Sequence, residues 1–169
     1  FGGIEFDAGA AEVLINGSAA AESDLRAGMP VRVAGAVDPA GLTGTASRIE
    51  YRSRLVGVVG RVDAADGSLR VLGQTVLRDA FTALYDPASE KIEAGNVVEV
   101  GGCDDGDAIR ATYLRRRHPV FVPGTTALEL SGVVRDLDAA GRTFRIGDQI
   151  VDFAGAARAG FAGGLPLDG

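Results

Sequence analysis

A short block that occurs twice limits the folds that this sequence can adopt. Residues 25–35, Leu-Arg-Ala-Gly-Met-Pro-Val-Arg-Val-Ala-Gly, return as residues 92–102, Ile-Glu-Ala-Gly-Asn-Val-Val-Glu-Val-Gly-Gly, with identity at 5 of 11 positions. In both copies two valines flank a charged residue, which is the period-two pattern of a half-buried strand. The glycine before the strand indicates a turn with positive φ, and the glycine after it indicates a bulge or tight bend. The block predicts turn, strand and turn, used repeatedly.

The repeat divides the chain into three predicted units. Residues 1–54 form the first unit and residues 55–115 the second, each with short alternating strands separated by polar turns. Residues 116–127 contain two prolines and are predicted to be an extended linker, because proline fixes φ and disfavours helix at the preceding residue. Residues 128–169 restart the pattern as a partial third unit.

The third unit is predicted to be half a unit. Gly57 of the second unit recurs 75 positions later as Gly132, and Gly95, where the repeated strand begins, corresponds to Gly169 at the last position. Half a unit leaves unpaired strand edges and an uncovered apolar face. Three explanations stay open: the sequence is cut short, the half-unit packs on its own chain, or a strand from another chain completes it in a head-to-tail assembly.

Short strands joined by polar turns predict an all-β chain of small barrels or sandwiches. In the first unit, residues 2–7 and 12–17 are predicted to form a hairpin across a loop at residues 8–11. Asn16-Gly17 tolerates positive φ and is predicted to turn the chain into the next strand. In the second unit, residues 57–63 and 68–76 are predicted to pair in the same manner.

Composition narrows the classes of partner and cofactor. The net charge is −6 and the isoelectric point is 4.8, so the long-range field repels phosphate backbones and nucleic acid is not an expected partner. The single cysteine, Cys103, excludes an internal disulfide and a cysteine cluster for zinc or iron–sulfur, and no cofactor is expected. The longest apolar runs have strand length, so no segment is expected to span a membrane. No methionine opens the sequence, and we expect a trimmed fragment.

Several motifs in fixed order connect the chain to a known family. They are Val-Leu-Gly-Gln-Thr-Val at residues 71–76, the block at residues 92–102 and Ile-Arg-Ala-Thr-Tyr-Leu at residues 109–114, preceded by a Gly-x-Val strand opening. Together they resemble the bacterial domain-of-unknown-function family 5666, in two complete copies and one partial copy. The short loop at residues 8–11 and the missing second half of the third unit depart from the family pattern.

The resemblance implies an architecture and a location. It implies tandem small β-barrels similar to the oligonucleotide/oligosaccharide-binding fold, two complete and one truncated, in exported or envelope-attached proteins. The family has no assigned catalytic residues, so none is carried over to this chain.

Asp104, Asp105 and Asp107 are the candidate metal ligands. Three carboxylates within a short stretch could hold a hard cation such as calcium. They lack the alternating spacing of a calcium loop and its distant glutamate, and Asp-Gly also favours a plain hairpin turn. The turns at residues 63–67 and 136–141 receive the same interpretation.

Other candidate sites are weighed against simple structural roles. The basic run at residues 115–118, Arg-Arg-Arg-His, could contact nucleic acid, but aromatic residues for base stacking are scarce and we expect the arginines to face solvent or pair with carboxylates. His118 lacks a nucleophile motif, and Cys103 is expected to be an inert thiol near a turn. The dispersed aromatic residues are expected in the core, with sugar binding as the alternative for Tyr51, Tyr85 and Tyr113; the others are Phe1, Phe6, Phe81, Phe121, Phe144, Phe153 and Phe161.

We therefore expect a non-catalytic, extracytoplasmic β-barrel repeat protein that serves as a structural, spacer or binding module. The main alternative is a subunit of a head-to-tail assembly completed through the open edge of residues 128–169. A weaker alternative is a carbohydrate- or cation-binding module, and a hydrolase finds little support in this composition.

Overall fold

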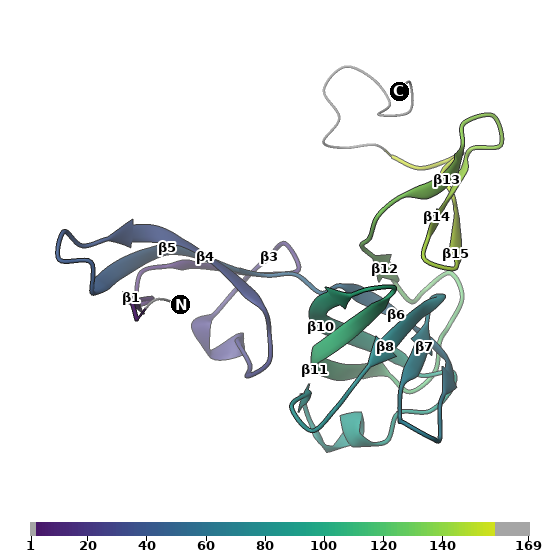
Figure 1. Cartoon of the computed structure of the whole chain (residues 1–169), viewed down its shortest axis with the longest axis horizontal. Helices are drawn as coiled ribbons and strands as arrows, with labels where there is room; N and C mark the ends of the chain where they lie inside the picture. The colour runs from purple at the N-terminus through teal and green to yellow at the C-terminus, as the bar shows by residue number, and fades with distance from the viewer. Residues whose placement is uncertain (1–2, 158–169) are drawn as a thin grey trace.

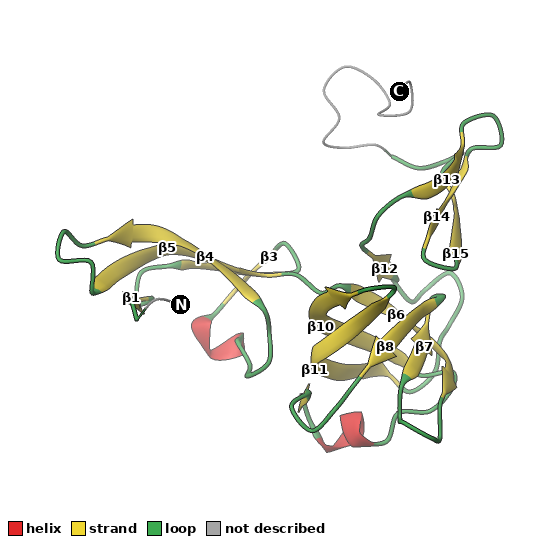
Figure 2. Ribbon diagram, in the orientation of Figure 1, coloured by secondary structure: helices red, strands yellow, loops and turns green. Residues whose placement is uncertain are grey.

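The computed structural model describes residues 3–157, and its regular elements are β-strands and two short 3₁₀ helices. The predicted all-β class is confirmed. The strands form three sheets that follow one another along the chain (Figure 1), and loops rather than helices connect them (Figure 2). In the described part of the chain, no helix has the length and apolarity needed to cross a bilayer. The predictions for Phe1, Phe161 and Gly169 lie outside the described residues.

The first sheet is built around β5. One edge of β5 pairs antiparallel with β4, and the other edge pairs in parallel with β1 and then β2, while β3 pairs with β2. The elements are β1 (Glu5–Asp7), β2 (Glu12–Ile15), β3 (Ser18–Ala20), the 3₁₀ helix η1 (Glu22–Asp24), β4 (Val31–Val37) and β5 (Thr43–Tyr51).

This arrangement corrects two predictions for the first unit. The predicted hairpin of residues 2–7 with 12–17 does not form, because β5 is long enough for β1 and β2 to lie end to end along one of its edges. The sheet is also open rather than closed, because among the described residues β4 pairs with β5 alone. Two complete barrels are therefore not observed.

The central sheet closes on itself. Its strands pair in the ring β6–β7–β8–β11–β10 and back to β6, with β8 and β11 parallel and the other neighbours antiparallel. Closure removes the free edges of these strands where they pair. Similarity to the oligonucleotide/oligosaccharide-binding fold stays a prediction. The elements are β6 (Leu55–Val62), β7 (Leu69–Val71), β8 (Gln74–Leu77), β9 (Ala83–Leu84), the 3₁₀ helix η2 (Pro87–Glu90), β10 (Val97–Asp105), β11 (Ala108–His118) and β12 (Glu129–Leu130).

The interior of this ring is the main hydrophobic core. Alternate residues of each strand point inward, and each large aliphatic side chain buried there contributes roughly 1.5–3 kcal/mol. The core residues are Leu55, Val59, Leu69, Val71, Val76, Ile92, Val98, Val100, Ile109, Ala111 and Leu114.

The third sheet is a three-stranded antiparallel meander of β13 (Arg135–Asp138), β14 (Thr143–Ile146) and β15 (Gln149–Asp152). Phe144 stacks on Phe153 with ring centroids 5.7 Å apart. Leu137 and Ile150 of this sheet are exposed, and so are Val133 and Val134 in the segment before it.

The repeated block adopts the same backbone in both copies. Gly28 and Gly95, which precede β4 and β10, have φ of +85° and +89°. A register shift occurs at Gly35 in β4 and at Gly102 in β10, so the predicted bulge is present twice. A Cβ on either of these two glycines would collide with a carbonyl oxygen of the neighbouring strand. The local chain is equivalent, but Gly28 packs against β11 whereas Gly95 faces open space.

The predicted linker begins later than expected. β11 continues through His118, which pairs with Val97 of β10, so residues 116–118 are strand. β10 supplies a long partner edge that the prolines at positions 119 and 123 do not interrupt.

Candidate functional site

A polar cluster is buried where the first sheet meets the central ring. Glu99 lies on the outer face of β10, which the first unit covers, and its side chain is only 3% exposed. The Asn16 amide donates to one carboxylate oxygen and the Arg117 guanidinium donates to the other, both at 2.9 Å. The Asn16 side chain also accepts a hydrogen bond from the Ser53 backbone amide at 2.8 Å. The turn of the first unit is thereby bonded to β10 and to the segment that connects β5 with β6.

The sequence positions Asn16 for this role. Asn16 and Gly17 have φ of +51° and +80°, so the predicted positive-φ turn is confirmed. This turn joins β2 to β3 and directs the Asn16 amide at β10. A buried carboxylate is costly unless it is paired and hydrogen-bonded, and here both oxygens have a partner.

Tyrosine rings complete the junction. Tyr51 and Tyr113 are almost fully buried and meet edge to face, with centroids 5.8 Å apart, and Tyr85 meets Tyr113 in the same geometry at 6.4 Å. Arg115 lies over the Tyr85 ring at 4.2 Å. The hydroxyl groups of Tyr51 and Tyr113 lack a partner in hydrogen-bond geometry.

Burial and the nearby Glu99 charge disfavour ionisation of these tyrosines. Burial, with the Glu99 charge as the second cause, raises the pKa of Tyr113 to about 12. The same two causes raise the pKa of Tyr51 still further.

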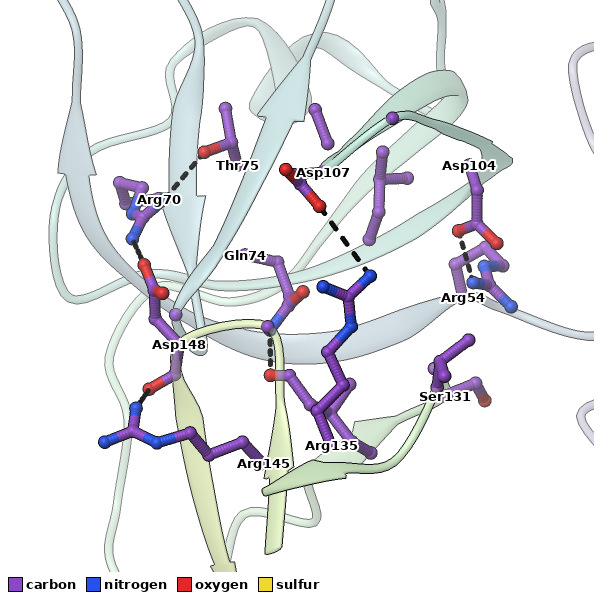
Figure 3. A pocket seen from close by; sticks show the side chains of 18 of the residues that line it. Arg54, Arg70, Gln74, Thr75, Asp104, Asp107, Ser131, Arg135, Arg145 and Asp148 are labelled. Carbon is purple, nitrogen blue, oxygen red and sulfur yellow. Dashed lines mark hydrogen bonds and ion pairs between the residues drawn. The ribbon is translucent and has the colours of Figure 1, made fainter. Parts of the chain in front are cut away.

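A second feature is a cleft between the central ring and the third sheet (Figure 3). Its volume is about 550 Å³, and its walls come from the β7–β8 turn, the β10–β11 hairpin tip and the β14–β15 turn. The Gln74 amide donates to the Ile146 carbonyl at 2.6 Å and fixes two of these turns to each other. The charged side chains that line it are Arg54, Arg70, Arg135, Arg145, Asp104, Asp107, Asp136 and Asp148.

Charged side chains of both signs line the cleft in pairs. Arg54 pairs with Asp104 and Arg70 with Asp148 in close contacts. The other two pairs are loose, with Arg135 at 3.9 Å from Asp107 and Arg145 at 3.8 Å from Asp136. The lining therefore presents hydrogen-bond donors and acceptors of nearly balanced charge, which suits a polar ligand without a large net charge.

The candidate metal ligands do not converge on one point. Asp104 faces Arg54, Asp105 accepts two hydrogen bonds from Arg110, and Asp107 faces Arg135. Among residues 3–157, no group of three histidine, cysteine, aspartate or glutamate side chains is placed to hold a metal ion. The structure thus uses these carboxylates as arginine partners.

The basic run is distributed over different contacts. Arg115 stacks on Tyr85, Arg116 donates to the Lys91 carbonyl at 3.2 Å, and Arg117 binds Glu99. His118 and the exposed Cys103 lie six residues apart in register along β10, which is about 20 Å in a strand. The single histidine and the single cysteine therefore cannot act on one substrate atom.

The aromatic residues follow the predicted core role only in part. Tyr51, Tyr113 and Phe153 are buried, whereas Phe81 is 91% exposed and Phe6 lies at the surface. Phe81 lies in the connection between β8 and β9, where its side chain is open to solvent.

Sequence reasoning missed both the junction and the cleft. Alternation along β10 indicates that Glu99 faces away from the ring core, and its burial depends on residues distant in the chain such as Asn16, 83 positions away. The four cleft arginines come from separate elements and share no motif.

Comparisons with known proteins add one finding. A family model described as a domain of unknown function (DUF5666) matches residues 56–115, so the resemblance expected from the sequence is confirmed for that segment. No curated protein and no solved structure matches the chain.

Proposed function

The chain contains a domain of the DUF5666 family, and from this premise we propose that it is a non-catalytic structural module located outside the cytoplasm. Its β units form a rigid series that spaces or assembles other components. The observation that carries the proposal is the buried junction of Asn16, Glu99 and Arg117. A flexible tether would not require a buried carboxylate with two partners from distant parts of the chain.

The placement of the reactive side chains favours a role without catalysis. His118 and Cys103 are too far apart to form a nucleophile–base pair. Asp104 and Asp148 of the cleft are engaged in ion pairs with Arg54 and Arg70. The extracytoplasmic location is supported by the family resemblance alone.

Distance measurements between spin labels test the rigid series. The exposed Cys103 carries one label, and Leu42→Cys at the β4–β5 tip, where Leu42 is 70% exposed, carries the other. We expect one narrow distance distribution by pulsed electron resonance. Asn16→Ala, which removes the bonds to Glu99 and Ser53, should broaden it.

Arg32→Ala is the matched control, because Arg32 is the exposed counterpart of Glu99 in the first unit. This variant should keep the narrow distribution. A broad distribution in the unmodified chain would show a flexible tether and contradict the proposal.

The cleft favours a second candidate function, the binding of a polar ligand such as a neutral oligosaccharide. Its volume of about 550 Å³ lies within the range of small-molecule sites, and it presents both donors and acceptors. The loosely paired Arg135 and Arg145 are the side chains most available to a ligand.

Amide chemical shifts, recorded with a panel of neutral oligosaccharides, test this candidate. Binding predicts shifts confined to Gln74, Asp107 and residues 131–133, and a clear loss of affinity in Arg135→Ala. Arg48→Ala, far from the cleft in the first sheet, is the control. Absence of shifts across the panel, or equal affinity of both variants, would reject oligosaccharide binding in the cleft.

A further inference from the structure

One free strand edge and one extended segment outside any strand lie toward opposite ends of the described chain. Among residues 3–157, β4 pairs with β5 alone, and residues 131–134 belong to no strand. Val31 and Val33 on β4 are each 43% exposed, and Val133 is 70% exposed. Free edges with exposed apolar side chains are the places where another chain adds to a sheet.

In the central ring, the strands that correspond to these two segments, β6 and β10, pair with each other within one unit. Leu55–Val58 of β6 run antiparallel to Val97–Val100 of β10, with Leu55 opposite Val100 and Gly57 opposite Val98. In the repeat, residues 130–133 are the counterparts of residues 55–58, in the same order. Residues 30–33 are likewise the counterparts of residues 97–100.

We propose that residues 130–133 of one copy of this chain pair with residues 30–33 of a second copy, in the register of β6 on β10. Leu130 then lies opposite Val33, and Gly132 lies opposite Val31. The inference rests on the proposed structural role and names the partner as a second copy. The two surfaces differ and every copy carries both, so association continues head to tail.

Two charged positions at the proposed contact have the opposite signs to their counterparts in the central ring. In the central ring, Glu99 of β10 lies diagonal to the position of Arg54, one residue before β6. In the proposed contact the same two positions hold Arg32 and Glu129, so opposite charges again become diagonal neighbours. A segment that carried arginine at the position of Glu129, as the second unit does with Arg54, would place a like charge beside Arg32. The charges therefore favour the segment of the third unit as the one that pairs with β4.

The N-terminal end of residues 130–133 is already bonded to the central ring of its own chain. β12 pairs with β6, and the Ser131 amide donates to the Arg54 carbonyl at 3.1 Å. This attachment fixes the start of residues 130–133 beside the central ring. Fewer residues have to be ordered when the second copy binds, which lowers the entropic cost of association.

Cysteine cross-linking tests the partner and the register. In a Cys103→Ser background, one batch carries Arg32→Cys and another carries Ser131→Cys, which lie directly opposite in the proposed register. Opposed Cβ atoms in a sheet are about 4.5–5.5 Å apart, within reach of a disulfide after small adjustment. Mixing the batches under mild oxidation should give a covalent dimer, and each batch alone should give far less.

A register control uses Val33→Cys with Ser131→Cys, which places the two thiols on opposite faces of the sheet and should give little dimer. Equal dimer from Arg32→Cys alone would show pairing of β4 with β4 and overturn the proposal. Absence of cross-linking in the mixture would also overturn it.

Sedimentation velocity separates this contact from the structural role. The average mass of the unmodified chain should rise with concentration, and Val133→Lys should weaken association about tenfold, which corresponds to about 1.4 kcal/mol. Val120→Lys, at a residue that is 64% exposed outside the segment, should behave like the unmodified chain. A monomeric chain, or equal effects of both variants, rejects the contact, whereas a narrow spin-label distance would still support the rigid module.

Discussion

Replacing Arg117 with methionine is expected to lower the free energy of unfolding by about 3 kcal/mol. Methionine keeps an apolar stem but leaves one carboxylate oxygen of the buried Glu99 without its charged partner. The remaining bond from the Asn16 amide cannot compensate a buried charge on its own. Urea unfolding at neutral pH measures the change.

A matched exposed pair is the control for this prediction. Arg48 and Glu12 are each about half exposed, with side-chain exposures of 53% and 54%, so Arg48→Met should cost less than about 1 kcal/mol. Adding Glu99→Gln to Arg117→Met removes the unpaired charge and should recover part of the lost stability. Equal losses in Arg117→Met and Arg48→Met would contradict the view that Glu99 is buried and paired.

Alkaline pH is expected to destabilise the fold through Tyr51 and Tyr113. Below pH 10 both hydroxyl groups are neutral in the folded and the unfolded chain, so the tyrosines add no pH dependence there. Above pH 10 the unfolded chain releases these protons while the folded chain retains them, so the free energy of unfolding falls as pH rises. By pH 12, Tyr113 alone accounts for a loss of about 2 kcal/mol, and Tyr51 adds at least a comparable amount.

The variant Tyr51→Phe, compared with the unmodified chain at pH 8 and at pH 12, tests the contribution of Tyr51. The Tyr51 hydroxyl lacks a partner in hydrogen-bond geometry but lies close to Glu99, so the stability difference between the variant and the unmodified chain at pH 8 serves as the reference. At pH 12 the variant should be the more stable of the two, in urea unfolding followed alongside tyrosinate absorbance. Parallel stability curves from pH 8 to pH 12 would show that Tyr51 ionises as readily in the fold as in the unfolded chain.

Local features of the fold were predictable from the sequence. The turns at Gly28 and Gly95, the bulges at Gly35 and Gly102, and the Asn16-Gly17 turn all appear where the residue types indicated them. Each depends on backbone conformations that glycine or asparagine adopts most readily, and such steric preferences act within a few residues. The family of residues 56–115 was also predictable, because its motifs keep a fixed order.

Strand pairing in the first unit was not predictable in the same manner. β1 and β2 carry the pattern of a hairpin, but both pair with β5. A strand edge offers the same backbone donors and acceptors to many partners, so the outcome depends on which edges are near each other and how long they are.

The sequence by itself determined the class of this protein, its repeat and the positions of its turns, because these follow from side-chain alternation and backbone sterics. Only the tertiary structure decided that Glu99 is buried, that four arginines share one cleft and that β4 has no partner but β5 among residues 3–157. The reason is that burial and pairing depend on groups far apart in the chain, such as Asn16 and Glu99, and no local pattern records which of them meet.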